Sequence, residues 1–276
     1  MPTGSRALVL AGGGVTGIAW EVGVLAGLEE AGIDLAPDLV IGTSAGSVAG
    51  AQLLSGSPLP ELYARQLSDD HHEIAPLIEL PQLLQDHPEF IQLALNPSRE
   101  VAVSLGRQAR DAKTPTPAVR RASVARRLTS EKWPDRPFVI TAVDADTGDT
   151  VLLDRDAGVD LVDAVTASCA IPCLWPPVEL LGRTLIDGGA RSPSHLDLAS
   201  GHELVVVLSP IIAAASAGLD REAEQLRASG SRVIVISVDD EAFHAMGMNA
   251  LDPTRRNPAA QHGRRQGLAF DRALLG

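Results

Sequence analysis

The chain has 276 residues, of which 45% are hydrophobic, and a formal net charge of −12. This length and hydrophobic content suit one large α/β domain, and the negative charge argues against a general nucleic-acid binder. No apolar run has the length of a signal sequence or of a membrane-spanning helix. We therefore expect a cytoplasmic protein, whose contact with a membrane would be peripheral.

The N-terminal part alternates apolar runs with glycine turns and helical patterns. Residues 6–10 predict a short buried strand, followed by a glycine turn and a helix over 18–32. A second strand over 38–43 leads directly into a helix of small residues over 45–56. Such alternation favours a parallel sheet with helices packed against it.

Residues 58–127 show no strand alternation and have the pattern of several helices separated at prolines. We interpret them as a helical insertion within a single domain that spans residues 1–276. Residues 99–127 hold eight basic and two acidic side chains, a local charge of +6. This basic segment is either the ordinary solvated face of helices or a surface that meets anionic lipid headgroups.

Strands return after the insertion. The pattern predicts a strand over residues 136–144 and its hairpin partner over 150–154. A helix over 158–170 follows, and then a pair of short strands over 178–187. The last predicted elements are a buried strand over 203–210, a helix over 221–228, a second buried strand over 232–239 and a helix in the polar tail beyond 252.

Glycine and serine cluster where the second strand ends. The residues Gly42-Thr43-Ser44-Ala45-Gly46 fit the G-x-S-x-G nucleophile elbow, in which a sharp turn projects the serine hydroxyl at the top of the sheet. Small flanking residues are needed there because neighbouring backbone passes close by. The same residues are also compatible with a plain Gly-Ser turn between two core elements.

A second glycine cluster lies between the first strand and the first helix. Gly12, Gly14 and Gly17 satisfy G-x-G-x-x-G, the fingerprint of dinucleotide-binding proteins. That fingerprint needs an acidic residue at the end of the second strand, where this chain has Ser44. An oxyanion hole explains both clusters, because the amides of Gly12, Gly13 and Gly14 would face Ser44 if the two strands are neighbours.

A serine nucleophile needs a base. The candidates are the carboxylates and all seven histidines, namely His71, His72, His87, His195, His202, His244 and His262. Among the acids, Asp187 is the most suggestive, because it follows a strand and precedes Gly188 and Gly189. A strand-end aspartate before two glycines is also an ordinary turn residue. Among the histidines, His244 is the best placed, because it follows a late strand.

Three stretches carry a resemblance to a known family: LVLAGGGVTGIAWEVGVLAGLEEAGI, DLVIGTSAGSVAGAQL and AVTASCAIPCLWPPVELLGRTLIDGG. In this order, from Leu8 to Gly189, they resemble the patatin-like phospholipase family. The resemblance implies a three-layer α/β/α sandwich with a mostly parallel central sheet. It also implies a serine acyl hydrolase that cleaves lipid carboxylic esters through an acyl-enzyme, as a phospholipase A, lysophospholipase or esterase, without a metal or an organic cofactor.

The resemblance also assigns roles to residues. It implies a Ser–Asp dyad that works without histidine, with Ser44 as nucleophile and Asp187 as base. The implied oxyanion donors are the backbone amides of Gly12, Gly13 and Gly14. The remaining motif glycines would support the loops around the site: Gly17, Gly42, Gly46, Gly188 and Gly189.

The chain departs from the family pattern at Thr16, where many members have an arginine in the glycine loop, and after Gly189, where an Asn-x-Pro pattern is missing. Headgroup and acyl-chain preference, regiospecificity and oligomeric state stay open. Two other functions also stay open: a catalytically silent lipid-binding protein of the same fold, and a dinucleotide-dependent oxidoreductase. Cys169 and Cys173 lack the neighbours of a zinc site and are expected to be small buried residues.

Overall fold

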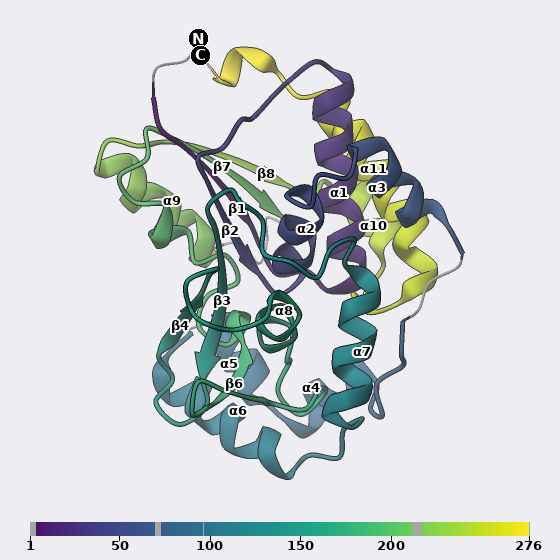
Figure 1. Cartoon of the computed structure of the whole chain (residues 1–276), viewed down its shortest axis with the longest axis vertical. Coiled ribbons are helices and arrows are strands. Elements are labelled where there is room, and N and C mark those ends of the chain that lie inside the picture. Colours follow the sequence, from purple (N-terminus) through teal and green to yellow (C-terminus); the bar gives the residue numbers. More distant parts are fainter. Residues whose placement is uncertain (1–3, 70–72, 96, 212–216, 276) are drawn as a thin grey trace.

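The computed structural model of the chain describes residues 4–69, 73–95, 97–211 and 217–275 (Figure 1). An eight-stranded mixed sheet runs through this described part in the order β5-β6-β3-β2-β1-β7-β8, and β4 pairs with β3 outside that path. The strands are β1 (Arg6–Leu10), β2 (Leu39–Thr43), β3 (Phe138–Asp144), β4 (Thr150–Leu153), β5 (Val178–Leu180), β6 (Arg183–Asp187), β7 (Leu204–Ser209) and β8 (Arg232–Ser237).

The helices include every helical segment that the sequence predicts. They are α1 (Gly14–Glu30), α2 (Ala45–Leu53), α3 (Leu59–Leu67), α4 (Leu80–Asp86), α5 (Glu89–Leu95), α6 (Arg99–Asp111), α7 (Pro117–Arg127), α8 (Leu161–Ser168), α9 (Ala217–Ala228), α10 (Asp240–Met246) and α11 (Arg256–Leu268). The five helices α3 to α7 occupy residues 58–127, and no strand lies among the described residues of that segment.

Helices α1 and α10 are two of those that differ from the sequence prediction. α1 begins at Gly14 rather than at residue 18, because Gly13 takes the cap position and the glycine turn is the first turn of the helix. α10 was not predicted, because its seven residues are too few for a clear period. Its start is fixed by Asp239, whose side chain accepts a hydrogen bond from the amide of Ala242.

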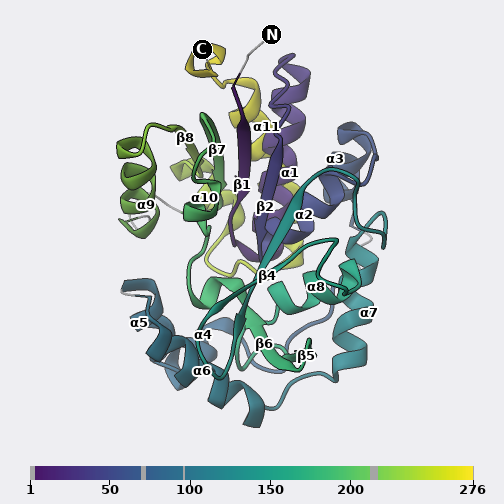
Figure 2. The same cartoon turned by 60° about the vertical axis from the view of Figure 1, so that its left-hand side comes forward.

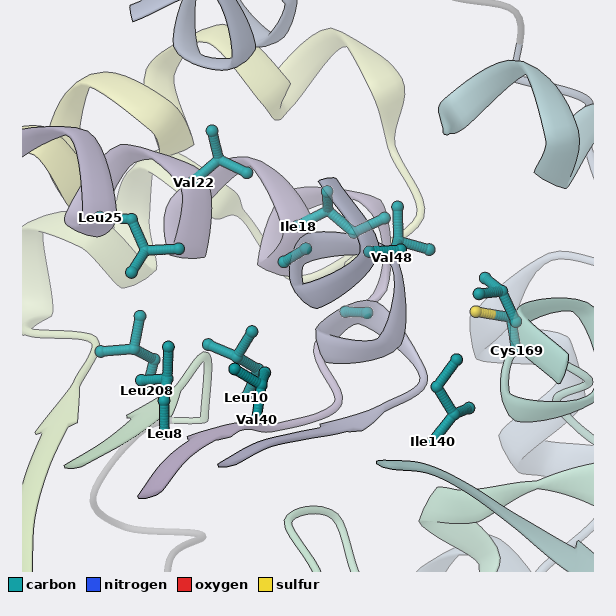
Figure 3. Close-up of a cluster of buried hydrophobic side chains, with 14 of the residues drawn as sticks. Leu8, Leu10, Ile18, Val22, Leu25, Val40, Val48, Ile140, Cys169 and Leu208 are labelled. Carbon is teal, nitrogen blue, oxygen red and sulfur yellow. The ribbon is translucent and has the colours of Figure 1, made fainter. Parts of the chain in front are cut away.

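The alternation of side chains along the central strands assigns each face of the sheet to its own helices. On β1, Leu8 and Leu10 pack in the cluster that includes α1 and α2, whereas Ala7 and Val9 pack on the opposite face. Figure 3 shows the first cluster, with Leu8, Leu10, Val40 and Leu208 beneath α1. The second face is covered by α9, which lies across the sheet from α1 and α11 in both views (Figures 1 and 2). The predicted α/β/α layering is therefore confirmed.

Helices α1 and α11 pack with their backbones close together. Gly23 and Gly27 of α1 face Gly263 and Gly267 of α11, and a Cβ atom at any of the four would overlap a backbone carbonyl oxygen of the other helix. Only glycine allows this approach. The contact matters for the site because α1 begins in the glycine loop.

Candidate active site

Three strands, β2, β4 and β6, pair with β3, and their positions along its two edges determine which of them meet near the site. β4 pairs antiparallel with residues 140–143 of β3. β2 pairs with residues 138–141 and β6 with residues 142–144, and each range overlaps that of β4. A strand edge accepts one partner at each position, so β2 and β6 share the edge opposite β4.

On that shared edge, β2 and β6 meet end to end. The parallel strand β2 ends at Thr43, opposite Thr141, whereas the antiparallel strand β6 ends at Asp187, opposite Ala142. Ser44 follows Thr43 at the junction, and its Oγ donates a hydrogen bond of 2.8 Å to Asp187 Oδ2. Two side chains 143 positions apart in the sequence are therefore brought together by strand pairing.

Ser44 lies in a strained turn. Its φ of 52° and ψ of −113° are values that residues other than glycine rarely adopt, at a typical cost of about 1–3 kcal/mol. Its amide donates to Ser168 Oγ over 2.9 Å. Its carbonyl oxygen accepts from the hydroxyl of Ser47 at 2.6 Å and from the thiol of Cys169 at 3.2 Å. These bonds hold the strained backbone, and with it the hydroxyl.

The elbow glycines are needed for close packing. A Cβ atom on Gly46 would overlap the carbonyl oxygen of Leu10, because α2 rests directly on β1. A Cβ atom on Gly42 would lie 2.6 Å from the carbonyl oxygen of Gly46. The G-x-S-x-G pattern is thus explained at each glycine by a backbone neighbour.

Asp187 is buried, with 4% of its surface exposed. Burial raises the pKa of its carboxyl group to about 6, while hydrogen bonds from the Gly189 amide and the Ser44 hydroxyl, and the charge of Arg120, act in the opposite direction. The Gly189 amide donates to Oδ1 over 2.8 Å, which leaves Oδ2 for Ser44. A Cβ atom on Gly188 would overlap the side chain of Thr141, so this turn also has room for glycine alone.

The glycine loop lies beside Ser44, as the sequence predicts, but one of its three assigned amides is occupied. A Cβ atom built on Gly12 would lie 3.6 Å from Ser44 Cβ, so the two turns are neighbours. The amide of Gly12, however, donates to the carbonyl oxygen of Pro193 over 2.8 Å. The N–H of Gly12 therefore already has a partner in this structure, unlike the free donor that the prediction requires.

Gly13 and Gly14 are better placed. They form the start of α1, where the first amides have no acceptor within the helix. Gly17 packs against the ring of Pro210 and donates its amide to the carbonyl oxygen of Gly13, which fixes the loop. Thr16 is buried, and its amide and hydroxyl both donate to the carbonyl oxygen of Ala250.

Ala45 is a further candidate residue of the site, which the sequence prediction did not include. It is the first residue of α2, directly after Ser44, so its amide also lies at a helix N-terminus. Both helix ends carry partial positive charge and face the same cavity, which is lined by Gly14, Ser44 and Ala45. The signal was present, because the residue after the nucleophile is a usual oxyanion donor in such elbows.

No histidine contacts the Ser44–Asp187 pair in the described part of the chain. The ring of buried His195 pairs with the carbonyl oxygen of Gly188 over 3.0 Å, and burial lowers its pKa. His202 pairs with the carbonyl oxygen of Ala199, and His244 is exposed on α10. His71 and His72 lie outside the described residues.

Not all arginines of helix α7 lie on the surface. Arg120 is only 2% exposed and lines the same cavity as Ser44, and Arg127 is bound by Glu73 in an ion pair between two side chains that are each 11% exposed. Other basic residues of the segment are paired on the surface: Arg99 with Asp149, Arg110 with Asp146 and Arg121 with Asp163. For the interpretation of residues 99–127 as a surface that meets anionic headgroups, these pairings leave only a few free charges.

Both cysteines are buried and free, as predicted. Among the described residues, no group of three His, Cys, Asp or Glu side chains is arranged to hold a metal ion.

Comparisons with known proteins find similar solved structures and one family. Among solved structures, the chain is similar to VipD from Legionella pneumophila, at 12% identity and a TM-score of 0.46, with 97% of this chain and 66% of that chain covered. It is also similar to ExoU in its complex with SpcU from Pseudomonas aeruginosa, at 17% identity and a TM-score of 0.39, with 96% and 53% covered. The chain thus spans about two thirds of the one and about half of the other.

Among curated proteins, none matches the chain. A family model described as patatin-like phospholipase matches residues 8–200, which include both glycine clusters, Ser44 and Asp187. This match covers well over half of the sequence. The chain belongs to the patatin-like phospholipase family.

Proposed function

We propose that the chain is a serine hydrolase that cleaves carboxylic esters of lipids, with Ser44 as nucleophile and Asp187 as its base. The observation that carries the proposal is the 2.8 Å hydrogen bond from Ser44 Oγ to Asp187 Oδ2. A carboxylate in this position can accept the hydroxyl proton as the oxygen attacks a carbonyl carbon. Membership of the family supports a lipid ester as the substrate.

In the first half-reaction, Ser44 Oγ attacks the ester carbonyl carbon and its proton passes to Asp187. The tetrahedral intermediate collapses as the C–O bond to the alcohol breaks, and the alcohol leaves with the proton from Asp187. The acyl group stays on Ser44 as an ester. In the second half-reaction, Asp187 takes a proton from water, which attacks the acyl-enzyme, and the proton returns to Ser44 as the fatty acid leaves.

The negative charge of each tetrahedral intermediate needs fixed donors. We assign this role to the amides of Gly13, Gly14 and Ala45, at the N-termini of α1 and α2. Gly12 is left out of this set because its amide is bonded to Pro193. Two helix ends directed at one oxyanion add their partial charges to these hydrogen bonds.

The cavity at Ser44 has a volume of only about 20 Å³, enough for one water molecule. Its walls include Ile171, Trp175 and Leu251. A lipid ester therefore enters only after these walls move apart. The apolar character of these three side chains suits an acyl chain beside the reacting carbonyl.

The two rival functions are less well supported. A dinucleotide fingerprint needs a loop open to a pyrophosphate, but here the loop is packed against Pro193, Pro210 and Ala250. It also needs an acid at the end of β2, where the Thr43 hydroxyl pairs with that of Thr141. A silent lipid-binding protein would need neither the short Ser44–Asp187 bond nor the strained elbow.

Labelling with a fluorophosphonate tests the proposal and separates it from the silent alternative. We expect a single adduct, on Ser44, found by mass spectrometry of the native protein and absent from Ser44→Ala. Ser168 is a matched control, because it is a buried serine that contacts Ser44 without contacting Asp187. No adduct, or an adduct on Ser168 or Ser192 in place of Ser44, would contradict the assignment.

A further inference from the structure

Arg120 stands out among the buried side chains because most of its donors have no acceptor. It is 2% exposed, and its Nη2 donates one hydrogen bond, of 3.2 Å, to the carbonyl oxygen of Cys169. Its guanidinium lies 4.0 Å from the centroid of the Trp175 ring. In the described part of the chain, Nε and Nη1 are buried without a hydrogen-bond partner. Unpaired buried donors of a charged group are costly, so a purely structural role leaves them unexplained.

The other arginines of α7 that face the protein have carboxylate partners. Arg127 is bound by both oxygens of Glu73, and Arg121 donates to Asp163 over 2.5 Å. Among the described residues, no carboxylate oxygen lies within 4.0 Å of Arg120. Helix α7 thus holds one buried cation, Arg120, whose Nε and Nη1 have no acceptor among the described residues and are free to bind a ligand.

The position of Arg120 connects it to the chemistry. It lines the same small cavity as Ser44. That cavity shares Val15, Ile18 and Arg127 with a neighbouring cavity of about 280 Å³. The larger cavity has four arginines and one acidic residue in its lining: Arg65, Arg126, Arg127, Arg256 and Glu73. An arginine-lined cavity therefore adjoins the small cavity that holds Ser44 and Arg120.

The electrostatics of Arg120 favour an anion there. Burial and the neighbouring charge of Arg127 together lower the pKa of its guanidinium to about 9, against the smaller opposing effects of Glu73 and Asp187. The group still carries its charge at neutral pH, in an apolar setting beside another cation. An anion would relieve both effects, since it would supply acceptors and an opposite charge.

We propose that Arg120 binds the phosphate group of a glycerophospholipid or lysophospholipid substrate, with the rest of the headgroup in the arginine-lined cavity. In such lipids the phosphate and the scissile ester share one glycerol unit, so a cation beside the nucleophile is in the right place. The planar fork of an arginine matches two phosphate oxygens. This inference rests on the proposed ester hydrolysis and names its substrate class.

The test compares two esters with the same acyl chain, a monoacylglycerol and a lysophosphatidic acid, and follows the ratio of their kcat/KM values. In Arg120→Gln, we expect the preference for the phosphate-bearing ester to fall about 10–100-fold, the usual range for a lost bond to a charged group. Arg120→Lys, which keeps the charge but not the fork, should recover part of it. The ratio cancels any common effect on Ser44 and Asp187.

Arg121→Gln is the matched control, since it removes a neighbouring arginine whose side chain is 43% exposed and paired with Asp163. It should keep the parent ratio. If both esters are hydrolysed and the ratio is the same in Arg120→Gln as in the parent, the inference is wrong. If the folded parent hydrolyses neither ester, the proposed function fails instead, and the binding measurement below still decides the role of Arg120.

Binding can be followed without catalysis, because Arg120 stacks on Trp175. Titration with glycerol 3-phosphate should give a saturable change in tryptophan fluorescence that is absent from Trp175→Phe and Arg120→Gln and retained in Arg121→Gln. Inorganic phosphate serves as a second titrant. Weaker binding of inorganic phosphate supports a headgroup site. No change with either titrant, or an unchanged titration in Arg120→Gln, would overturn the inference.

Discussion

The ionisation of Asp187 decides when the Ser44 hydroxyl can react. Burial raises the pKa of this carboxyl group to about 6, and only its ionised form can accept the proton of Ser44. We therefore predict that kcat/KM for a neutral ester is lost as pH falls through about 6 and is level at higher pH. The measurement is the pH profile of kcat/KM with an uncharged substrate, so that substrate ionisation plays no part.

His195 has a lowered pKa and lies near the turn, so it could produce a similar profile. The variant His195→Ala removes this ambiguity. It should keep both the midpoint and the shape of the profile, because the imidazole bonds to Gly188 and not to Ser44. A profile that becomes flat in His195→Ala would assign the titration to the histidine.

Substitutions in the glycine loop cannot test the oxyanion hole separately from the fold. A Cβ atom on Gly13 would lie 2.5 Å from Pro210 Cβ, and Gly14 has a φ of +65°, where side chains are strained. Substituting either residue would disturb packing as well as the amide. Loss of activity in a Gly13→Val protein would therefore report on the fold and on the oxyanion hole together.

At the scale of the elements, the close packing of α1 against α11 depends on the glycines at their contact. Alanine in place of glycine normally stabilises a helix by about 1 kcal/mol. At Gly263 the added methyl group would overlap the carbonyl oxygen of Trp20, and overpacking of this kind typically costs about 1–3 kcal/mol. We predict that Gly263→Ala lowers the free energy of unfolding, measured by urea titration.

Gly218 of α9 provides the control for this prediction. Among the described residues outside its own helix backbone and chain neighbours, the nearest heavy atom to a Cβ there is 4.0 Å away, on the flexible side chain of Arg221. Gly218→Ala should therefore leave the stability unchanged or slightly raised. Equal or greater stability of Gly263→Ala than of the parent would show that the two helices do not need the close approach described above.

For the whole molecule, membrane contact stays a prediction, and the structure limits its strength. None of the helices in the described part of the chain has both the length and the apolar content to cross a bilayer. Within the basic segment, Arg107, Lys113 and Arg126 are exposed and form no ion pair among the described residues. Three free charges near an anionic surface contribute about 3 kcal/mol, at about 1 kcal/mol each.

We therefore expect weak binding to anionic vesicles that disappears at high salt, where charges are screened over about 3 Å at 1 M. Reversal of all three charges, in Arg107→Glu with Lys113→Glu and Arg126→Glu, should abolish the binding at low salt as well. Co-sedimentation with phosphatidylglycerol vesicles measures it. Tight binding that survives high salt and the triple reversal would require a different, apolar contact.

Much of the fold could be predicted from the sequence, because the apolar runs and glycine turns are local signals. The order of the strands is not local. The meeting of β2 and β6 along one edge of β3, which brings Asp187 to Ser44, depends on pairings between distant segments. For that reason, the residues alone left Asp187 as a plain turn residue, and its role came only from the family resemblance.

Other details of the site could not be predicted because they run against the usual patterns. Helix α7 buries Arg120 and exposes Val119, at 2% and 49% of their surfaces, the reverse of the ordinary preference. The bond from Gly12 to Pro193 likewise depends on a loop that comes far later in the chain. In both places, tertiary contacts override the local chemistry of the segment.

The central claim is that Asp187, and no histidine, is the base of Ser44. The most direct measurement is ester hydrolysis by Asp187→Asn and His195→Ala, each shown to be folded by circular dichroism. We predict that Asp187→Asn loses at least about 10²–10⁴-fold in kcat, the usual cost of losing a general base, and that His195→Ala stays within about tenfold of the parent. Collapse of activity in His195→Ala, with Asp187→Asn still active, would contradict the account.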